Sequence, residues 1–537
     1  MMQPPWKTTF HVLRQTENDA AVPVLLAGLD ARDPQVQQES LRALLDRRSV
    51  TGQREIVRRL HRLPAQWKPL LEQRRARLES ALRDALLGEE EQSRHNAYYA
   101  VVWLRQYDLL PVLLTLLESP QCPEPDRVGQ TLLHLAGRLD SDLHGMRNYK
   151  DRRDPFRLRH FVLGALEKSL QRWPQHQRDE VIESFLILAP RDHVLLRRIL
   201  SDPFHPCYLK VLEFLTHSKR EPILRLLLSF LENPTAPSAA LQTLARRTDP
   251  EFLQYLLSKI GYQPSKAAAA NLRRIERIAW ADPQQGVLDQ LSEAHQYSAV
   301  QMLIRSRVPR QQVFRALKHL LQHGHPAGRR AAVQALAEFS GAEANQLVLQ
   351  ALQDPDPQVQ AAAVSQVRRR NIPGALSILV EALDSPLAPV RRAAAAALPE
   401  FQFSRYLGSF DTLDDVSRES TGRMVVKVDP QALVKLRQEM QAKARSRRLR
   451  AVEMALAMGV VPQVQGTLIQ LLQDEDHLVR VEAVEALALG EGSEVDEALQ
   501  RALHDPSVLV QDAARGVLQR RAASGQSAPF DEGNFQI

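Results

Sequence analysis

Apolar and small residues recur along most of the chain at the spacing of one face of an α-helix. The pattern is most regular within residues 326–401, where a short alanine-rich segment starts at positions 328, 359 and 390 and thus at a constant interval. A fixed period of about 31 residues indicates a helix pair stacked on copies of itself, because one pair cannot bury its own apolar face. The pattern therefore predicts an all-α fold, an α-solenoid (α-α superhelix) of stacked antiparallel helix pairs.

The same signature returns outside this block. A second set of three begins at Arg448, Val479 and Val510, at the same interval, and marks regular repeats over 430–521. A further copy lies near residue 20, and weaker copies follow it, so we expect degenerate helical repeats over 20–325. Asp-Pro dipeptides separate many of these segments, as expected where a turn leads into a new helix.

Several segments do not follow the repeat. Residues 1–19 form a polar lead-in, the charged stretch 140–157 is expected to be a polar loop, and the tail 522–537 is expected to be disordered. The two regular blocks lie farther apart than one repeat step, by nearly the length of another repeat. We place this extra chain at 402–429 and expect an insertion loop there, with a β-prone run at 424–428.

Composition supports a helical protein and limits the function. Of 537 residues, 44% are hydrophobic and only 5% aromatic, which suits closely packed helices. Lys and Arg exceed Asp and Glu by 70 to 63, a much milder excess than in a dedicated nucleic-acid binder. Two cysteines suggest a reducing compartment. The longest uncharged apolar run, Leu109 to Leu117, is far shorter than the roughly 20 residues of a membrane span. We therefore expect a cytoplasmic protein.

The most complete copy of the repeat runs from Asp474 to Leu487, and residues 354–367 and 505–518 follow it closely. These segments resemble the HEAT-repeat superfamily, in the short form called PBS-lyase HEAT-like repeats. The resemblance implies an armadillo-like helical solenoid but says little about function, because such repeats serve scaffolds, adaptors and a few enzymes.

The resemblance also implies a contact between neighbouring repeats, in which a turn aspartate bonds to an arginine of the second helix. The residues expected to have this structural role are Asp474, Arg480, Arg391 and Arg329. The alternative is that these arginines form a basic ridge for an acidic partner. Gln360 and Gln511 replace the arginine in two repeats, so a continuous ladder of such contacts is not expected.

The stretch 435–450 is the strongest candidate for a partner-binding surface. Its candidate binding residues are Lys435, Arg437, Lys443, Arg445 and Arg447. Leu433, Leu436 and Met440 have helical spacing and should face the core, which leaves the basic side exposed. The simpler interpretation is a solvated charged face without a ligand.

The insertion carries a second candidate set. Its partner-binding candidates are the aromatic residues Phe403, Tyr406 and Phe410. They form either a docking element for a partner or a cap that packs over a groove between repeats, and the sequence does not decide between these alternatives.

Catalytic and metal-binding patterns are absent from the sequence. His319 and His323 are spaced to share an ion, but no Cys or carboxylate completes the set, and the histidines favourably meet a helix end at Gly324. There is no phosphate-binding loop, dinucleotide fingerprint, zinc-protease motif or nucleophile elbow. We therefore expect no metal, no cofactor and no enzymatic activity.

The sequence thus favours a non-catalytic scaffold or adaptor that binds a protein partner through an extended surface. The alternative is a nucleic-acid-associated protein that uses the basic stretch 435–450. Within that alternative lies a HEAT-like DNA glycosylase, for which Trp103 with Asp108 or Trp280 with Asp282 would be the residues to consider. A tryptophan in a helical array is more often a core residue.

Overall fold

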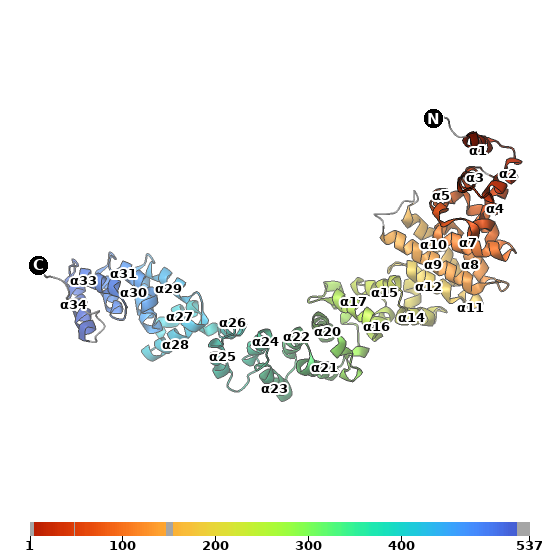
Figure 1. Ribbon diagram of the computed structural model, residues 1–537. Helices are drawn as coiled ribbons and strands as arrows, with labels where there is room; N and C mark the ends of the chain where they lie inside the picture. The colour runs from red at the N-terminus through yellow and green to blue at the C-terminus, as the bar shows by residue number, and fades with distance from the viewer. Residues whose placement is uncertain (1–4, 48, 146–153, 524–537) are drawn as a thin grey trace. The chain divides into compact units, whose positions relative to one another are not determined.

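The computed structural model describes residues 5–47, 49–145 and 154–523, and within them it contains helices and no β-strand. This confirms the predicted all-α fold of stacked helix pairs (Figure 1). The chain divides into two compact units, Met1–Ala316 and Leu317–Ile537. The division falls within helix α21 (Arg310–His323).

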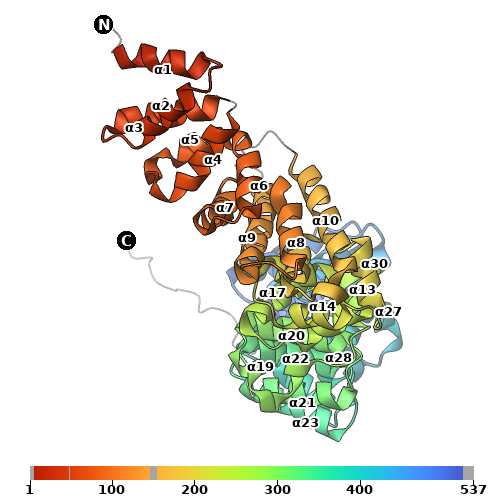
Figure 2. The same cartoon turned by 90° about the vertical axis from the view of Figure 1, so that its right-hand side faces the viewer.

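The first unit is a stack of short helices, and in Figure 2 its helices α6 to α9 lie side by side. Its α-helices are α1 (Pro5–Gln15), α2 (Ala21–Leu29), α3 (Pro34–Asp46), α4 (Val50–Arg59), α5 (Lys68–Gln73), α6 (Glu79–Leu87), α7 (Glu91–Trp103), α8 (Leu110–Glu118), α9 (Pro125–His144), α10 (Pro155–Gln171), α11 (Trp173–His176), α12 (Asp179–Leu188), α13 (Val194–Ser201), α14 (Tyr208–His217), α15 (Glu221–Ser229), α16 (Ser238–Arg246), α17 (Pro250–Ile260), α18 (Lys266–Leu272), α19 (Val287–Gln290) and α20 (Glu293–Arg305).

The second unit holds the regular repeats. Its α-helices after α21 are α22 (Pro326–Leu336), α23 (Ala342–Ala351), α24 (Pro357–Val367), α25 (Ala375–Leu383), α26 (Ala388–Ala396), α27 (Phe403–Ser409), α28 (Asp415–Val428), α29 (Ala432–Met440), α30 (Arg445–Met458), α31 (Val461–Leu471), α32 (His477–Leu487), α33 (Ser493–Ala502) and α34 (Val508–Ala523). Short 3₁₀ turns connect several helices, among them η1 (Leu60–Arg62), η2 (Ala65–Trp67) and η10 (Phe410–Thr412).

Turn aspartates start many of the second helices. Asp356 accepts hydrogen bonds from the amides of the first turn of α24, 2.8 Å from the nitrogen of Gln358, and Asp476 makes the same contact to Leu478 of α32. These bonds satisfy amides that have no partner inside the helix. The proline that follows such an aspartate occupies the first helical position in α3, α10 and α17, where a missing N–H costs nothing.

The expected insertion loop at 402–429 is wrong, because this segment forms helices α27 and α28. Asp414 caps α28 by accepting a hydrogen bond from the amide of Ser417 at 2.8 Å. The β-prone run 424–428 lies in the last turns of α28, where Val425 and Val428 are buried one turn apart. Burial of that face outweighs the weak helix propensity of valine. The extra chain is therefore another helix pair in the stack.

The structure also differs from the sequence predictions in three other segments that were expected to be irregular. The lead-in contains α1, which packs against α3. The expected polar loop 140–157 is helical at both ends, since α9 extends to His144 and α10 begins at Pro155, and residues 146–153 lie outside the described part of the chain. Of the expected tail, residues 522 and 523 belong to α34, and residues 524–537 also lie outside the described part.

An arginine side chain links consecutive second helices in three places. Arg370 donates to the carbonyls of Leu336 and Phe339, 34 and 31 residues earlier, at 2.7 Å each. Arg521 makes bonds with the same two offsets to the end of α32, and Arg47 makes them to the end of α1. These carbonyls lie at helix C-termini, where they lack partners within the helix. The shared geometry shows that α1 occupies the position of a second helix.

Candidate functional site

The basic stretch 435–450 lies on two helices, α29 and α30, rather than on one. Lys435 forms an ion pair with Asp429 at 2.8 Å, and Arg437 donates to the carbonyl oxygen of Gln463 at 2.6 Å. Burial alone would raise the pKa of Asp429, but the hydrogen bond from Lys435 and two backbone amides outweigh it, so the pKa is lowered. These two cations therefore have structural partners.

The remaining candidate cations of this stretch are mostly neutralised as well. Arg447 makes a forked contact to Glu439, with nitrogen to oxygen distances of 2.6 and 2.7 Å, and this hydrogen bonding lowers the pKa of the Glu439 carboxyl. Arg445 pairs with Asp476 at 3.0 Å. Lys443 is exposed, and among the described residues no carboxylate is within ion-pair distance of it. The stretch therefore offers little unbalanced charge to a polyanion.

Arginine and aspartate side chains connect neighbouring repeats through forked contacts. The three pairs are Arg329 with Asp354 (2.8 and 2.9 Å), Arg448 with Asp474 (2.8 and 3.0 Å) and Arg480 with Asp505 (2.9 and 2.9 Å). Each arginine belongs to the second helix of one repeat, and each aspartate to the turn of the next. Such charge-assisted forks are geometrically specific. Because these side chains are largely buried, they are not a basic ridge.

The ladder is interrupted where glutamine replaces arginine. Gln360 donates to the carbonyl oxygen of Asp354 in its own repeat at 2.6 Å, and Gln511 makes the equivalent bond at 2.8 Å. The next repeat after Gln360 has Ser385 at the position of the aspartate, so an arginine would find no carboxylate there. Arg391 donates to the carbonyl oxygen of Ser385 at 2.7 Å, a contact within its own repeat, and has no carboxylate partner among the described residues.

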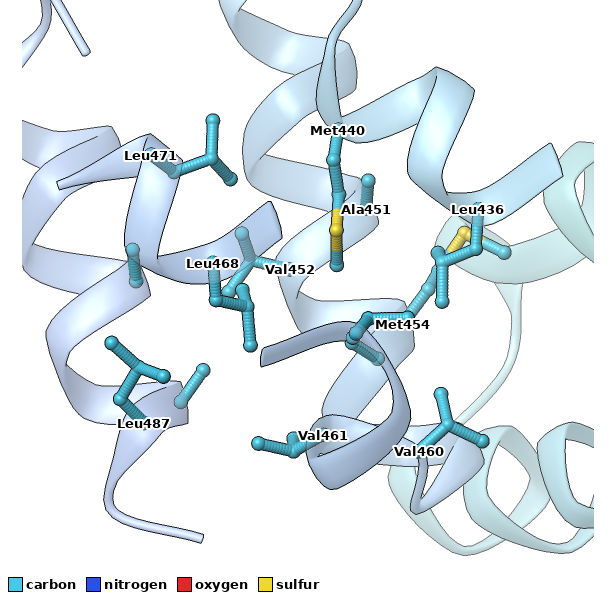
Figure 3. Close-up of a cluster of buried hydrophobic side chains, with 14 of the residues drawn as sticks. Leu436, Met440, Ala451, Val452, Met454, Val460, Val461, Leu468, Leu471 and Leu487 are labelled. Carbon is cyan, nitrogen blue, oxygen red and sulfur yellow. The ribbon is translucent and has the colours of Figure 1, made fainter. Parts of the chain in front are cut away.

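The insertion aromatics lie in the core. Phe403, Tyr406 and Phe410 are 2%, 1% and 1% exposed, in the cluster that also contains Leu436 and Met440, part of which Figure 3 shows. The Tyr406 hydroxyl donates to the carbonyl of Arg418 at 2.7 Å, and burial raises the pKa of Tyr406 to about 12. This corrects the docking alternative, since side chains at helical spacing pack inward between α27 and α30.

The other candidate residues from the sequence have contacts that are typical of residues with a structural role. Trp280 is fully buried, and Asp282 accepts a hydrogen bond from the amide of Gln284 at 3.1 Å, as a turn former does. The rings of His319 and His323 lie 5.0 Å apart. Within the described residues, no group of three or more His, Cys, Asp or Glu side chains could hold a metal ion.

Trp103 belongs to an aromatic platform on the surface of the first unit. Its ring stacks on Tyr99, which is 58% exposed, with centroids 6.1 Å apart. Lys68 donates to the Tyr99 hydroxyl at 2.7 Å and lies 5.2 and 5.4 Å from the two ring centroids, a cation–π arrangement. The Trp103 indole nitrogen donates to Glu72 at 2.8 Å. These contacts hold the platform in one geometry although it faces solvent.

A hollow lies on each side of this platform. The smaller, of about 370 Å³, is bounded in part by apolar residues from η1 to α5, including Leu60 of η1 and Leu63 and Pro64 of the connection to η2. The larger, of about 600 Å³, lies between α7 and α9, and its polar wall is Arg127, Gln130, Thr131, His134 and Arg138 of α9. We call the platform and its two hollows the α7 groove. Among the described residues, no Asp or Glu side chain lines either hollow.

The floor of the α7 groove is anchored by a buried asparagine. The Asn96 amide donates to the carbonyls of Val57 and Arg58 at the end of α4, both at 2.9 Å. The groove is not among the predictions from the sequence, in which Trp103 appears only together with Asp108. The available signal was Tyr99 and Trp103 at a spacing of four residues on one helix, in a chain that is only 5% aromatic.

No helix within the described part of the chain is long and apolar enough to cross a bilayer. The family model for HEAT repeats matches residues 314–399. No curated protein matches the chain.

Two solved structures are among those that align with most of this chain. One, from a study of a phosphorylation switch that controls the interaction between cadherin and beta-catenin, is 14% identical, with a TM-score of 0.37, over 94% of this chain and 99% of that one. The karyopherin Kap121p, bound to the extreme C-terminus of the phosphatase Cdc14p, is 15% identical, with a TM-score of 0.26, over 95% of this chain and 52% of that one. The match to the family model identifies HEAT repeats at residues 314–399, and helix pairs continue on both sides of this segment.

Proposed function

We propose that the chain is a non-catalytic scaffold or adaptor that binds a protein partner through the surface of its helix stack. The observation that carries the proposal is the α7 groove, where the exposed Tyr99 ring and the half-buried Trp103 ring are stacked next to two hollows. Tyrosine and tryptophan are enriched among the few interface residues that carry most of the binding energy. The fixed geometry lowers the entropy lost on binding.

A cytoplasmic location is part of this proposal. It rests on the composition of the chain, whose two cysteines are both free. Proteins of oxidising compartments more often pair their cysteines in disulfides.

The alternative of a nucleic-acid-associated protein has less support. The cations at 435–450 are mostly paired with carboxylates, whereas a polyanion site needs unpaired ones. An electrophoretic mobility shift with duplex and single-stranded probes at low salt separates the two functions. The scaffold proposal expects no shift, and a complex that weakens steeply with salt would support the alternative.

A quantitative affinity purification tests the scaffold proposal. The tagged full-length chain and the double variant Tyr99→Ala/Trp103→Ala are expressed in the source cells, and the recovered proteins are compared by mass spectrometry. We expect a defined set of proteins to be recovered with the unmodified chain and depleted from the variant. Tyr255→Ala is the matched control, because Tyr255 is a tyrosine of the same unit that is 56% exposed. Equal recovery with all three proteins would contradict the proposal.

A further inference from the structure

We infer that the α7 groove binds an extended acidic peptide segment of a partner protein. One bulky apolar side chain of the peptide enters the hollow beside Tyr99 and Trp103, and peptide carboxylates lie against the cations of α9. This inference rests on the proposed function and adds the chemistry of the partner.

The charge of the groove determines the sign of its ligand. Arg138 and His134 are exposed, and neither has an ion pair or a hydrogen bond within the described residues. Arg127 lies 3.5 Å from Glu124, which also accepts a contact from His95 at 2.8 Å and is therefore shared. Lys68 lies on the platform, and the described lining residues include no carboxylate, although Glu72 beside the platform accepts the hydrogen bond of the Trp103 indole. The lining of the groove is therefore cationic. Complementary charge favours acidic ligands and increases their association rate.

The spacing along α9 matches a peptide in extended conformation. Arg127, Thr131, His134 and Arg138 follow one another at helical spacing along one face. From Arg127 to Arg138 the helix rises about 16 Å at 1.5 Å per residue. About five residues of an extended chain cover that length at about 3.3 Å per residue. The groove therefore accommodates a short linear segment.

The apolar wall of the groove favours a peptide over a nucleic acid. The Lys68 ammonium lies at the hydroxyl end of Tyr99, where it donates a hydrogen bond at 2.7 Å. The smaller hollow, with Leu60, Leu63 and Pro64 in its wall, is suited to an aliphatic or aromatic side chain.

The test is a selection of peptides on the intact chain. A phage-displayed library of random twelve-residue peptides is selected on the full-length protein, and the recovered peptides are measured by fluorescence polarisation. We expect them to combine a bulky apolar residue with several acidic ones. Tyr99→Ala should weaken their binding about tenfold or more. The control Tyr255→Ala should leave it unchanged.

Charge reversal makes the test specific. Arg138→Glu should weaken the selected peptides about tenfold, and peptides with lysine in place of the acidic residues should regain binding to this variant. Arg246→Glu is the matched control, since Arg246 is exposed at the end of α16 and has no carboxylate partner among the described residues.

The possible failures can be distinguished. Selected peptides that are basic, or that bind equally to all variants, would overturn this inference but leave the scaffold function in place. If the library yields no binder and affinity purification yields no partner, both proposals fail. Tight binding of labelled single-stranded nucleic acid that is lost in Tyr99→Ala would assign the α7 groove to nucleic acid and overturn the peptide inference.

Discussion

The contact between Arg480 and Asp505 allows the strength of one inter-repeat link to be measured by a substitution that the chain itself uses. In Arg480→Gln, the new side chain can still donate to the carbonyl of its own turn, as Gln360 does at 2.6 Å. The two bonds to Asp505, each 2.9 Å long, are lost. The variant therefore removes the link between repeats and preserves the local one.

The expected magnitude follows from burial. The Arg480 and Asp505 side chains are 13% and 9% exposed, so their ion pair is partly buried. A surface ion pair contributes about 0–1 kcal/mol, and disruption of a fully buried pair costs about 3–5 kcal/mol. The cost for this pair should lie between these two ranges. Asp505 retains the hydrogen bond from the Ser507 amide at 2.7 Å, which limits the loss. We expect the local free energy of opening of α32–α34 to fall by about 2 kcal/mol, roughly a thirtyfold increase in the open population.

Hydrogen exchange of the full-length chain, followed by mass spectrometry of peptides from 477–523, measures this opening. Arg515→Gln is the control, because the Arg515 and Asp512 side chains form a surface pair and are each 60% exposed. It should change the opening free energy by less than about 0.5 kcal/mol. Equal protection of Arg480→Gln and the unmodified chain would show that the link between these repeats does not stabilise α32–α34.

A double-mutant cycle sharpens this prediction. Asp505→Ser reproduces Ser385, whose hydroxyl accepts a hydrogen bond from the Leu387 amide at 3.2 Å. The double variant Arg480→Gln/Asp505→Ser thus reproduces the native pair Gln360 and Ser385. We expect it to be more stable than the sum of the single changes by about 1–2 kcal/mol. Additive losses would show that the two side chains do not stabilise each other.

The same contact predicts a pH dependence. Burial alone would raise the pKa of Asp505, but hydrogen bonds from Arg480 and the Ser507 amide outweigh it and lower the pKa. A lowered carboxyl pKa gives stability that is present at neutral pH and is lost as the pH falls through the folded-state value. The difference in protection between Arg480→Gln and the unmodified chain should therefore shrink below about pH 4.

Two other properties can be predicted from close packing. A methyl group at Gly422 would lie 3.0 Å from the carbonyl oxygen of Ala457. Gly422→Ala should therefore destabilise the contact between α28 and α30 by about 1–3 kcal/mol, as measured by hydrogen exchange. The control Gly466→Ala places its methyl group in open space and should stabilise α31. Burial raises the pKa of the Cys207 thiol to about 11, so a thiol reagent at pH 8 should modify the half-buried Cys122 alone until the chain is denatured.

The regular repeats could be predicted because their pattern is local. Helical spacing, turn aspartates and a constant repeat step can all be read from short windows of sequence. The helices at 402–429 were missed for a different reason, since the prediction relied on the β-branched run near Val425 and on the broken step. Phe403, Tyr406 and Phe410 already have helical spacing, and that apolar pattern decided the structure.

The candidate surface was harder to predict because charge balance is a tertiary property. The carboxylates that neutralise Lys435 and Arg445 come from Asp429 and Asp476, outside the basic stretch. A linear count of charges could not find them. The α7 groove likewise depends on the contact of Lys68 with Tyr99, which is 31 residues away in sequence. It also depends on nearby apolar residues, none of which differs in sequence from an ordinary helix or turn residue.

The arginines that cap preceding second helices lead to a last prediction about how repeats share stability. Arg370 donates to two carbonyls at the end of α22 and to the side chain of Asn345 at 2.9 Å, so Arg370→Met would leave three acceptors without this donor. We expect a loss of about 2–3 kcal/mol in the opening free energy of the turn after α22 as well as of α24. Arg369→Met, at an exposed neighbouring position without an ion pair among the described residues, is the matched control and should change it by less than about 0.5 kcal/mol. Equal effects of the two variants would mean that the hydrogen bonds of Arg370 contribute no stability. A loss confined to α24 would mean that this side chain does not stabilise the preceding repeat.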